Sequence, residues 1–246
     1  MTYVTRLLEG LWGLYAWAIF LLCVLFSLIV VTIVPGLDRR QRLTTITCRA
    51  FFVLSGISVH VKGLESLPEG HCVVVANHAS YIDGPLLKGF LPARFSFVIK
   101  GEMRDIPIVH FLLRRAGSRF VERFTAAGSM RDARQIVKAA KGGQSMVFFP
   151  EGTFIKAAGV GRFRAGAFSA ATNGEMPVVP VAIFGTRRMM SSGQILPRPG
   201  RIRIDILPAI APENPAFADN RQLAEVARQA ILDVLDEPDL LEKEAQ

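Results

Sequence analysis

Residues 72–83 read CVVVANHASYID, and this stretch indicates both how the chain folds and where its chemistry lies. The apolar run at its start is typical of a strand buried in a sheet. A polar pair, Asn77 and His78, follows directly, and Asp83 stands five residues beyond the histidine. Because α/β folds place reactive groups at the carboxyl ends of buried strands, we expect a functional site immediately after this run.

His78 and Asp83 are the residue types that general-base catalysis of acyl transfer requires. A base must take the proton of an attacking hydroxyl, and neutral imidazole, with an unperturbed pKa of about 6.5, suits that task near pH 7. A carboxylate that accepts a hydrogen bond from the other ring nitrogen fixes the tautomer and stabilises the imidazolium. The alternative is a histidine and a helix-capping aspartate that merely satisfy one another. Ser80 is expected to cap the following helix.

Along the rest of the chain, short apolar runs alternate with helical patterns, which predicts an α/β fold with a central mixed sheet flanked by helices. The expected strands are residues 71–76, 95–100, 119–122, 145–149, 178–184 and 201–207. The expected helices are residues 83–90, 108–115, 129–141, 165–172 and about 219–235. No repeat or linker interrupts the pattern, so residues 60–246 are expected to form a single catalytic domain.

An uncharged apolar run from Leu11 to Val34 predicts an N-terminal hydrophobic membrane-anchor helix. Such a helix is long enough to cross a hydrocarbon core of about 30 Å. The run exceeds the apolar part of a secretion signal and no small-residue cleavage site follows, so we expect it to be retained. Arg39, Arg40 and Arg42 come next, and the positive-inside rule then places the catalytic domain on the cytoplasmic side of the inner membrane.

A second apolar stretch, Leu43 to Val59, completes an N-terminal region of residues 1–59. Arg49 is its one charged residue. The stretch is interpreted either as a segment that dips into the membrane beside the first helix or as a core helix that packs on the domain.

The charge distribution predicts an anionic partner. The net charge is +8, but residues 1–35 contribute zero and residues 213–246 contribute −6, so the part between them carries +14. We therefore expect attraction to an anionic membrane surface, to phosphate-bearing substrates or to an acidic carrier protein. Nucleic acid is not expected, because the basic residues are scattered and form no recognised binding signature. The three cysteines show no paired spacing, and no metal site is expected.

The run Asn77 to Asp83 resembles the signature of the glycerolipid acyltransferase family, which includes the 1-acylglycerol-3-phosphate acyltransferases: N-H, four residues, then D. Three further blocks match in the family's order, namely GSRFVER at 117–123, FFPEGT at 148–153 and PVVPV at 177–181. The resemblance implies acyl transfer from acyl carrier protein or coenzyme A to the free hydroxyl of 1-acyl-sn-glycerol 3-phosphate, giving phosphatidate. The thioester is a substrate, and no cofactor is expected.

The resemblance also implies roles for individual residues. His78 and Asp83 are the catalytic pair. In the second block an arginine holds the acceptor phosphate, for which a guanidinium fork is well suited. In the third block a carboxylate poised in a turn accepts from a glycerol hydroxyl or orients a basic partner. The substrate-binding residues implied in this way are Asn77, Arg123, Glu151, Gly152, Thr153 and Arg164.

One departure from the family pattern concerns the acceptor. After E-G-T the glycerol-phosphate enzymes usually continue Arg-Ser, whereas this chain has Phe154. Lys156 or Arg164 could supply the missing charge. Alternatively, the acceptor is another lysolipid, such as a lysophosphatidylglycerol or an amino-acid-containing lysolipid. An interpretation of a different class is a catalytically silent membrane adaptor that binds lipid or a partner through its basic surface.

Overall fold

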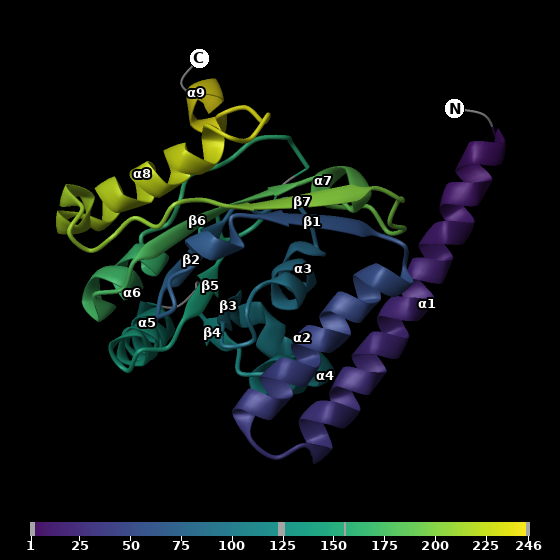
Figure 1. Ribbon diagram of the computed structural model, residues 1–246, viewed down its shortest axis with the longest axis horizontal. Helices are drawn as coiled ribbons and strands as arrows, with labels where there is room; N and C mark the ends of the chain where they lie inside the picture. Colours follow the sequence, from purple (N-terminus) through teal and green to yellow (C-terminus); the bar gives the residue numbers. More distant parts are fainter. Residues whose placement is uncertain (1–2, 123–125, 155, 245–246) are drawn as a thin grey trace.

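A seven-stranded sheet lies at the centre of the computed structural model, which describes residues 3–122, 126–154 and 156–244 (Figure 1). Its strand order is β1-β7-β6-β2-β5-β3-β4. The antiparallel pair is β6 and β7, and the other neighbouring pairs are parallel, so the sheet is mixed as predicted. The strands are β1 (Ser58–Lys62), β2 (Val73–Ala76), β3 (Ser96–Lys100), β4 (Arg119–Val121), β5 (Met146–Phe148), β6 (Val178–Phe184) and β7 (Arg201–Ile206).

Helices cover both faces of this sheet (Figure 1). The α-helices are α1 (Tyr3–Ile33), α2 (Leu37–Leu54), α3 (Asp83–Phe90), α4 (Pro107–Arg115), α5 (Ala126–Lys141), α6 (Gly166–Gly174), α7 (Thr186–Met189), α8 (Asn220–Leu232) and α9 (Leu240–Glu244). Among the described residues, the short 3-10 turns η1 (Leu64–Ser66), η2 (Gly101–Asp105) and η3 (Pro215–Ala218) lie between them. The flanking helices confirm the predicted α/β class.

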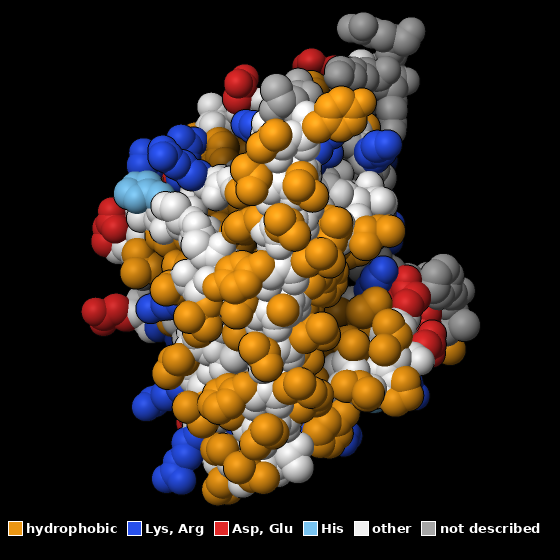
Figure 2. All heavy atoms as spheres, turned by 90° about the vertical axis from the view of Figure 1, so that its right-hand side faces the viewer, with side chains coloured by type: hydrophobic (Ala, Val, Ile, Leu, Met, Phe, Trp, Pro, Cys, Tyr) orange, Lys and Arg blue, Asp and Glu red, His pale blue; other side chains and the backbone are white. Residues whose placement is uncertain are grey.

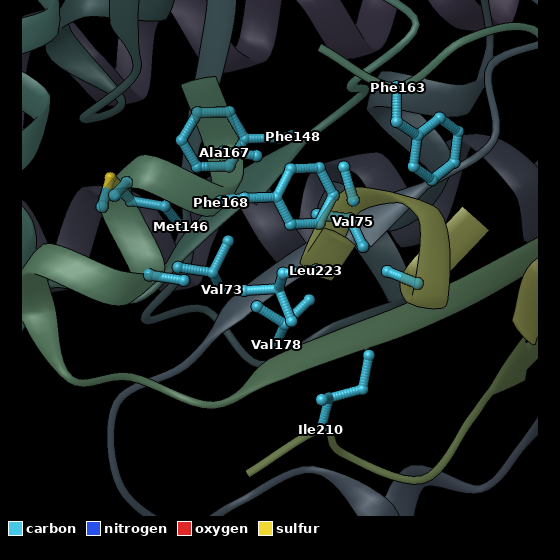
Figure 3. Packing of buried hydrophobic residues seen from close by; sticks show 14 of the residues in the cluster. Val73, Val75, Met146, Phe148, Phe163, Ala167, Phe168, Val178, Ile210 and Leu223 are labelled. Atoms are coloured by element: carbon cyan, nitrogen blue, oxygen red, sulfur yellow. The ribbon is translucent and has the colours of Figure 1, made fainter. Parts of the chain in front are cut away.

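The side chains of β2 alternate between two hydrophobic cores. Val73 and Val75 belong to the core that contains Phe168 of α6 and Leu223 of α8 (Figure 3). Val74 and Ala76 belong to the core on the other face, which is built with α2 and α3. Because β2 is buried on both faces and paired along both edges, its carboxyl end is a rigid starting point for the loop that follows.

The six predicted strands and five predicted helices are all present, with their ends moved by a few residues. The prediction lacks β1, which forms at the end of the second apolar stretch after α2 has stopped at Leu54. Its residues alternate between exposed and partly buried positions, as expected of an edge strand paired on one side, and therefore give a weak hydrophobic signal.

Helices α1 and α2 form an antiparallel hairpin along one side of the domain (Figure 1). The indole nitrogen of Trp17 donates to the Ile195 carbonyl at 2.8 Å, and Arg115 Nε donates to the Val31 carbonyl at 2.9 Å. The opposite side of α1 exposes a broad apolar surface (Figure 2). Its large members include Leu7, Leu11, Leu14, Leu21, Leu22, Leu25, Phe26 and Ile29. Among the described residues, α1 is the helix long and apolar enough to cross a membrane.

Helix α2 of the hairpin packs on the rest of the protein through a close approach to α3. A Cβ atom added at Gly89 would lie 2.9 Å from the backbone nitrogen of Arg49, and Arg49 Nε donates to the Gly89 carbonyl at 3.0 Å. Phe51 and Phe52 of α2 are buried in the core. The second apolar stretch therefore packs on the domain, as one of its two interpretations requires.

Gly89→Ala is expected to destabilise the fold by about 1–3 kcal/mol, because the added methyl group overpacks the contact between α2 and α3. Urea denaturation of detergent-solubilised protein measures the change. Gly84→Ala on the same helix is the matched control, since nothing lies within 4 Å of a Cβ at that position. The control should leave stability unchanged or raise it by up to about 1 kcal/mol. Equal losses in both variants would contradict the proposed tight contact.

Candidate active site

Loops from three neighbouring strands meet at one edge of the sheet. β2 pairs in parallel with β5 on one side and with β6 on the other, so the carboxyl ends of all three strands point the same way. Asn77 and His78 follow β2, and Phe149 to Thr153 follow β5. This is the position at which an open α/β sheet provides a crevice for reactive groups.

Asn77 holds the end of β2 against β6. Its side chain is 2% exposed and makes two hydrogen bonds with the backbone of Ile183. Nδ2 donates to the Ile183 carbonyl at 3.1 Å, and Oδ1 accepts from the Ile183 N–H at 2.8 Å. The amide thus extends the strand pairing by one side chain. Its contacts support a role in fixing the loop, and the substrate contact that the resemblance implies stays a prediction.

His78 and Asp83 lie side by side. His78 Nδ1 is 2.9 Å from Asp83 Oδ2, and the same oxygen accepts from the backbone N–H groups of Ala79 and Ser80, each at 2.8 Å. A carboxylate only accepts hydrogen bonds, so Nδ1 is the donor in this contact. In a neutral imidazole the lone pair then lies on Nε2. The geometry therefore provides an oriented base.

Burial differs sharply between the two partners. The Asp83 side chain is completely buried, whereas the His78 side chain is 18% exposed. The imidazole stacks on Phe149, with ring centroids 4.3 Å apart, and meets the edge of Phe154 at 4.5 Å. Phe154 also contacts Tyr81, at 4.7 Å between centroids. Aromatic rings thus restrict the histidine from the sides while the buried carboxylate holds Nδ1.

Ser80 does not cap α3, so that prediction is wrong. The helix begins at Asp83, and its N-cap position, Ile82, makes no side-chain capping bond. Ser80 Oγ instead donates to the Met190 carbonyl at 2.6 Å and accepts from the Ile82 N–H at 3.3 Å. The hydroxyl therefore ties the turn before α3 to the segment after α7.

Glu151 bridges two loops through backbone amides. Its Oε1 accepts from the His78 N–H at 2.8 Å, and its Oε2 accepts from the Gly161 N–H at 2.9 Å. Burial raises the pKa of this carboxyl above its ordinary value, while the two amide bonds and the charges of His78 and Arg187 oppose that rise. Both oxygens already have partners within the protein. The contacts thus support a role in holding the His78 backbone.

The run Pro150-Glu151-Gly152 forms a tight turn after β5. The Gly152 N–H donates to the Phe149 carbonyl at 2.9 Å, with proline at the second turn position. Gly152 has a φ of +82°, in the left-handed region that favours glycine. This conformation explains why glycine follows the glutamate.

The remaining candidate residues are distributed around this edge. Thr153 is exposed, and so is Arg164, whose backbone N–H donates to the Pro150 carbonyl at 2.9 Å. Arg123 lies outside the described residues. Within the part of the chain that the structure describes, no group of three or more His, Cys, Asp or Glu side chains could hold a metal ion.

Two aromatic contacts of His78 were not among the candidate site residues. Phe149 immediately precedes the proline of the third block, so its position directly after β5 was a usable signal. The contact of Phe154 with the histidine had no local signal, because the residues of the pair are far apart in sequence.

Known proteins resemble this chain in sequence. The Acyltransferase family model matches residues 58–184. A 1-acyl-sn-glycerol-3-phosphate acyltransferase of Pseudomonas aeruginosa is 31% identical over 70% of this chain and 68% of its own length. A chloroplastic 1-acyl-sn-glycerol-3-phosphate acyltransferase of Brassica napus is 33% identical over 54% of this chain, which spans only 39% of that relative.

A solved structure is similar over the whole chain. The crystal structure of the 1-acyl-sn-glycerophosphate acyltransferase PlsC from Thermotoga maritima superimposes with a TM-score of 0.77, covers 98% of each chain and is 24% identical. It thus shares the fold, including the sheet and its flanking helices. The buried strand, the histidine and aspartate in contact at its end and the extent of the family match define one class of protein. This chain belongs to the acyltransferase family.

Asn77→Ala is expected to destabilise the fold by about 1–3 kcal/mol, because it leaves the buried N–H and C=O of Ile183 without their side-chain partner. Chemical denaturation followed by circular dichroism measures the loss. Asn173→Ala is the matched control: Asn173 is exposed on α6 and bonds to a carbonyl one turn earlier. That variant should change stability by less than about 0.5 kcal/mol. An unchanged stability in Asn77→Ala would contradict the role of Asn77 in fixing the loop after β2.

Proposed function

We propose that this protein transfers a fatty acyl group from acyl carrier protein or coenzyme A to the free hydroxyl of 1-acyl-sn-glycerol 3-phosphate, forming phosphatidate for phospholipid synthesis. The observation that carries the proposal is the 2.9 Å contact between His78 Nδ1 and the buried carboxylate of Asp83. The printed names of the Pseudomonas aeruginosa and Brassica napus relatives support the choice of acceptor.

The proposed reaction needs no covalent enzyme intermediate. Nε2 of His78 takes the proton of the acceptor hydroxyl as its oxygen attacks the thioester carbonyl. The tetrahedral intermediate collapses, the carbon–sulfur bond breaks, and the imidazolium returns the proton to the departing thiolate. Asp83 stabilises the imidazolium between these two transfers, because its carboxylate already faces Nδ1.

The acceptor site is assigned to the loops around His78. Arg123, Arg164 and Thr153 are proposed to bind the acceptor's polar head, since guanidinium groups suit phosphate oxygens. Phe154 supports an alternative acceptor. It places an aromatic ring against His78, where the resemblance leads us to expect a basic side chain. A lysolipid with a different head group is therefore the second candidate substrate.

We further propose that the protein works at the cytoplasmic face of the inner membrane. The exposed apolar side of α1 suits insertion among lipid chains, and a lysolipid substrate stays in the bilayer. Arg39 and Arg42 are exposed in the first turns of α2, which follows α1 directly along the chain, and they favour anionic headgroups. A silent lipid-binding adaptor would use the same surface but has no need of an oriented base.

His78→Ala is expected to lower turnover by about 10² to 10⁴, because the variant lacks the base. The assay uses detergent-solubilised protein, acyl carrier protein and coenzyme A thioesters, and a panel of lysolipids that includes 1-acylglycerol 3-phosphate. His60→Ala, on the exposed edge of β1, is the matched control and should keep full activity.

The panel also separates the alternatives. Preference for another lysolipid would support the hypothesis that Phe154 marks a different acceptor, and would overturn 1-acylglycerol 3-phosphate as the proposed acceptor. No turnover of any lysolipid by folded protein that still binds vesicles would favour the adaptor. A His78→Ala variant with near-normal turnover would remove the catalytic assignment.

Vesicle binding is expected to rise with anionic lipid content and to fall with salt, because part of the attraction is electrostatic. Arg39→Gln combined with Arg42→Gln should lower the partition coefficient onto anionic vesicles by roughly fivefold per charge removed, or about 1 kcal/mol each. Flotation with liposomes measures this. Arg221→Gln on α8, away from α1, is the control (Figure 1). Binding that ignores both salt and lipid charge would contradict this electrostatic part.

A further inference from the structure

A segment close to the C-terminus lies against the loop that faces Glu151. Val160 forms a parallel bridge with Asp239. The Val160 N–H donates to the Pro238 carbonyl at 3.1 Å, and the Leu240 N–H donates to the Val160 carbonyl at 3.2 Å. Residues 237–240 lie beyond residues 58–184, the part that the family model matches. The loop of residues 157–161 is thus held by a segment from outside the matched region.

One arginine ties the first part of this loop to the segment. Arg187 pairs with Glu237 through two contacts, Nε to Oε1 at 3.0 Å and Nη2 to Oε2 at 2.9 Å. The same guanidinium donates to the carbonyls of Ala157 and Gly159, at 2.7 and 3.2 Å. Glu237 Oε2 in turn accepts from the Gly159 N–H at 3.0 Å. The side chains of Arg187 and Glu237 therefore hold the backbone of residues 157–159 through several hydrogen bonds.

A second arginine holds the last part of the loop. The side chain of Arg228 on α8 is 1% exposed and forms an ion pair with Asp239. Its Nε donates to the Gly161 carbonyl at 3.0 Å. A buried guanidinium is costly unless it is paired and hydrogen-bonded. The Asp239 carboxylate and the Gly161 carbonyl are therefore held in place by Arg228. Glu225 also pairs with Arg228, but it is 58% exposed on the solvent side of α8.

The loop of residues 157–161 in turn contacts Glu151, in the tight turn after β5. The Gly161 N–H donates to Glu151 Oε2, and Glu151 Oε1 accepts from the His78 N–H. We propose that Arg187, Arg228, Glu237 and Asp239 form a clamp that positions Glu151 and, through it, the backbone of His78. These four are positioning residues. The inference rests on the proposed function, since it assigns them to the geometry of the same base.

Glu237→Ala tests the clamp, with kinetics and hydrogen–deuterium exchange measured on the full-length protein. We expect kcat to fall about tenfold with the acceptor KM changed by less than about twofold, because the histidine is misplaced while the acceptor site is left intact. Exchange should quicken in the peptide of residues 157–161 and at the His78 amide. Glu237→Gln, which keeps the side-chain shape and one of the two acceptor oxygens, should recover part of kcat.

Glu225→Ala is the matched control, because it removes a carboxylate from the same Arg228 without touching the loop. It should change neither kcat nor exchange. Normal kcat in folded Glu237→Ala, a fall in kcat without faster exchange at His78, or an equal loss in the control would each overturn the clamp.

The test still decides if the variant does not fold or if the parent protein is inactive. If Glu237→Ala does not fold, Arg187→Lys replaces it, because lysine keeps the charge but cannot make the paired contacts with Glu237. If the parent protein transfers acyl groups to no lysolipid, the proposed function fails. The exchange measurement then still decides whether residues 237–240 control the His78 amide.

Discussion

One oxygen atom, Oδ2 of Asp83, organises the centre of this structure. It accepts from His78 Nδ1 and from the backbone N–H groups of Ala79 and Ser80, inside a completely buried side chain. A carboxylate buried away from water needs hydrogen-bond donors from the protein. Backbone N–H groups of the residues just before it in the chain are the nearest source. The turn from β2 to α3 supplies them, and the same contacts orient the imidazole. Local folding and the proposed chemistry therefore depend on the same interaction.

The sheet makes that arrangement stiff. β2 is a central strand with a core on each face, so the point at which the turn begins is fixed by packing. Asn77 extends the pairing to β6, and Glu151 reaches the His78 N–H from the loop after β5. The first residues beyond β2 are thus bonded to β6 and to the loop that follows β5. A loop that would otherwise be mobile carries the base in a defined place.

The parts of this site that could be read from the sequence are local ones. The apolar run of β2 and the spacing from His78 to Asp83 lie within twelve residues, and a tight turn at Glu151 follows from its proline and glycine neighbours. The partners of Glu151 could not be read, because the His78 N–H is 73 positions away. Arg228 meets Gly161 across 67 positions, from a helix whose pattern indicates only an amphipathic surface. Likewise an apolar N-terminal helix was predictable, but α1 begins at Tyr3, before the predicted Leu11, and the side of it that packs could not be predicted.

The aromatic surroundings of His78 separate two tasks within the site. Nδ1 is engaged by Asp83, and Phe149 and Phe154 flank the ring, so Nε2 is the atom left for proton transfer. An aromatic ring offers a phosphate no hydrogen bond, so Phe154 cannot bind a charged head group in the way a basic side chain would. In the proposed reaction, selection of the head group would depend on charged side chains farther from the histidine, whereas proton transfer would depend on the turn around Asp83. On this proposal, the head-group preference could differ between proteins of this fold without any change in His78 and Asp83.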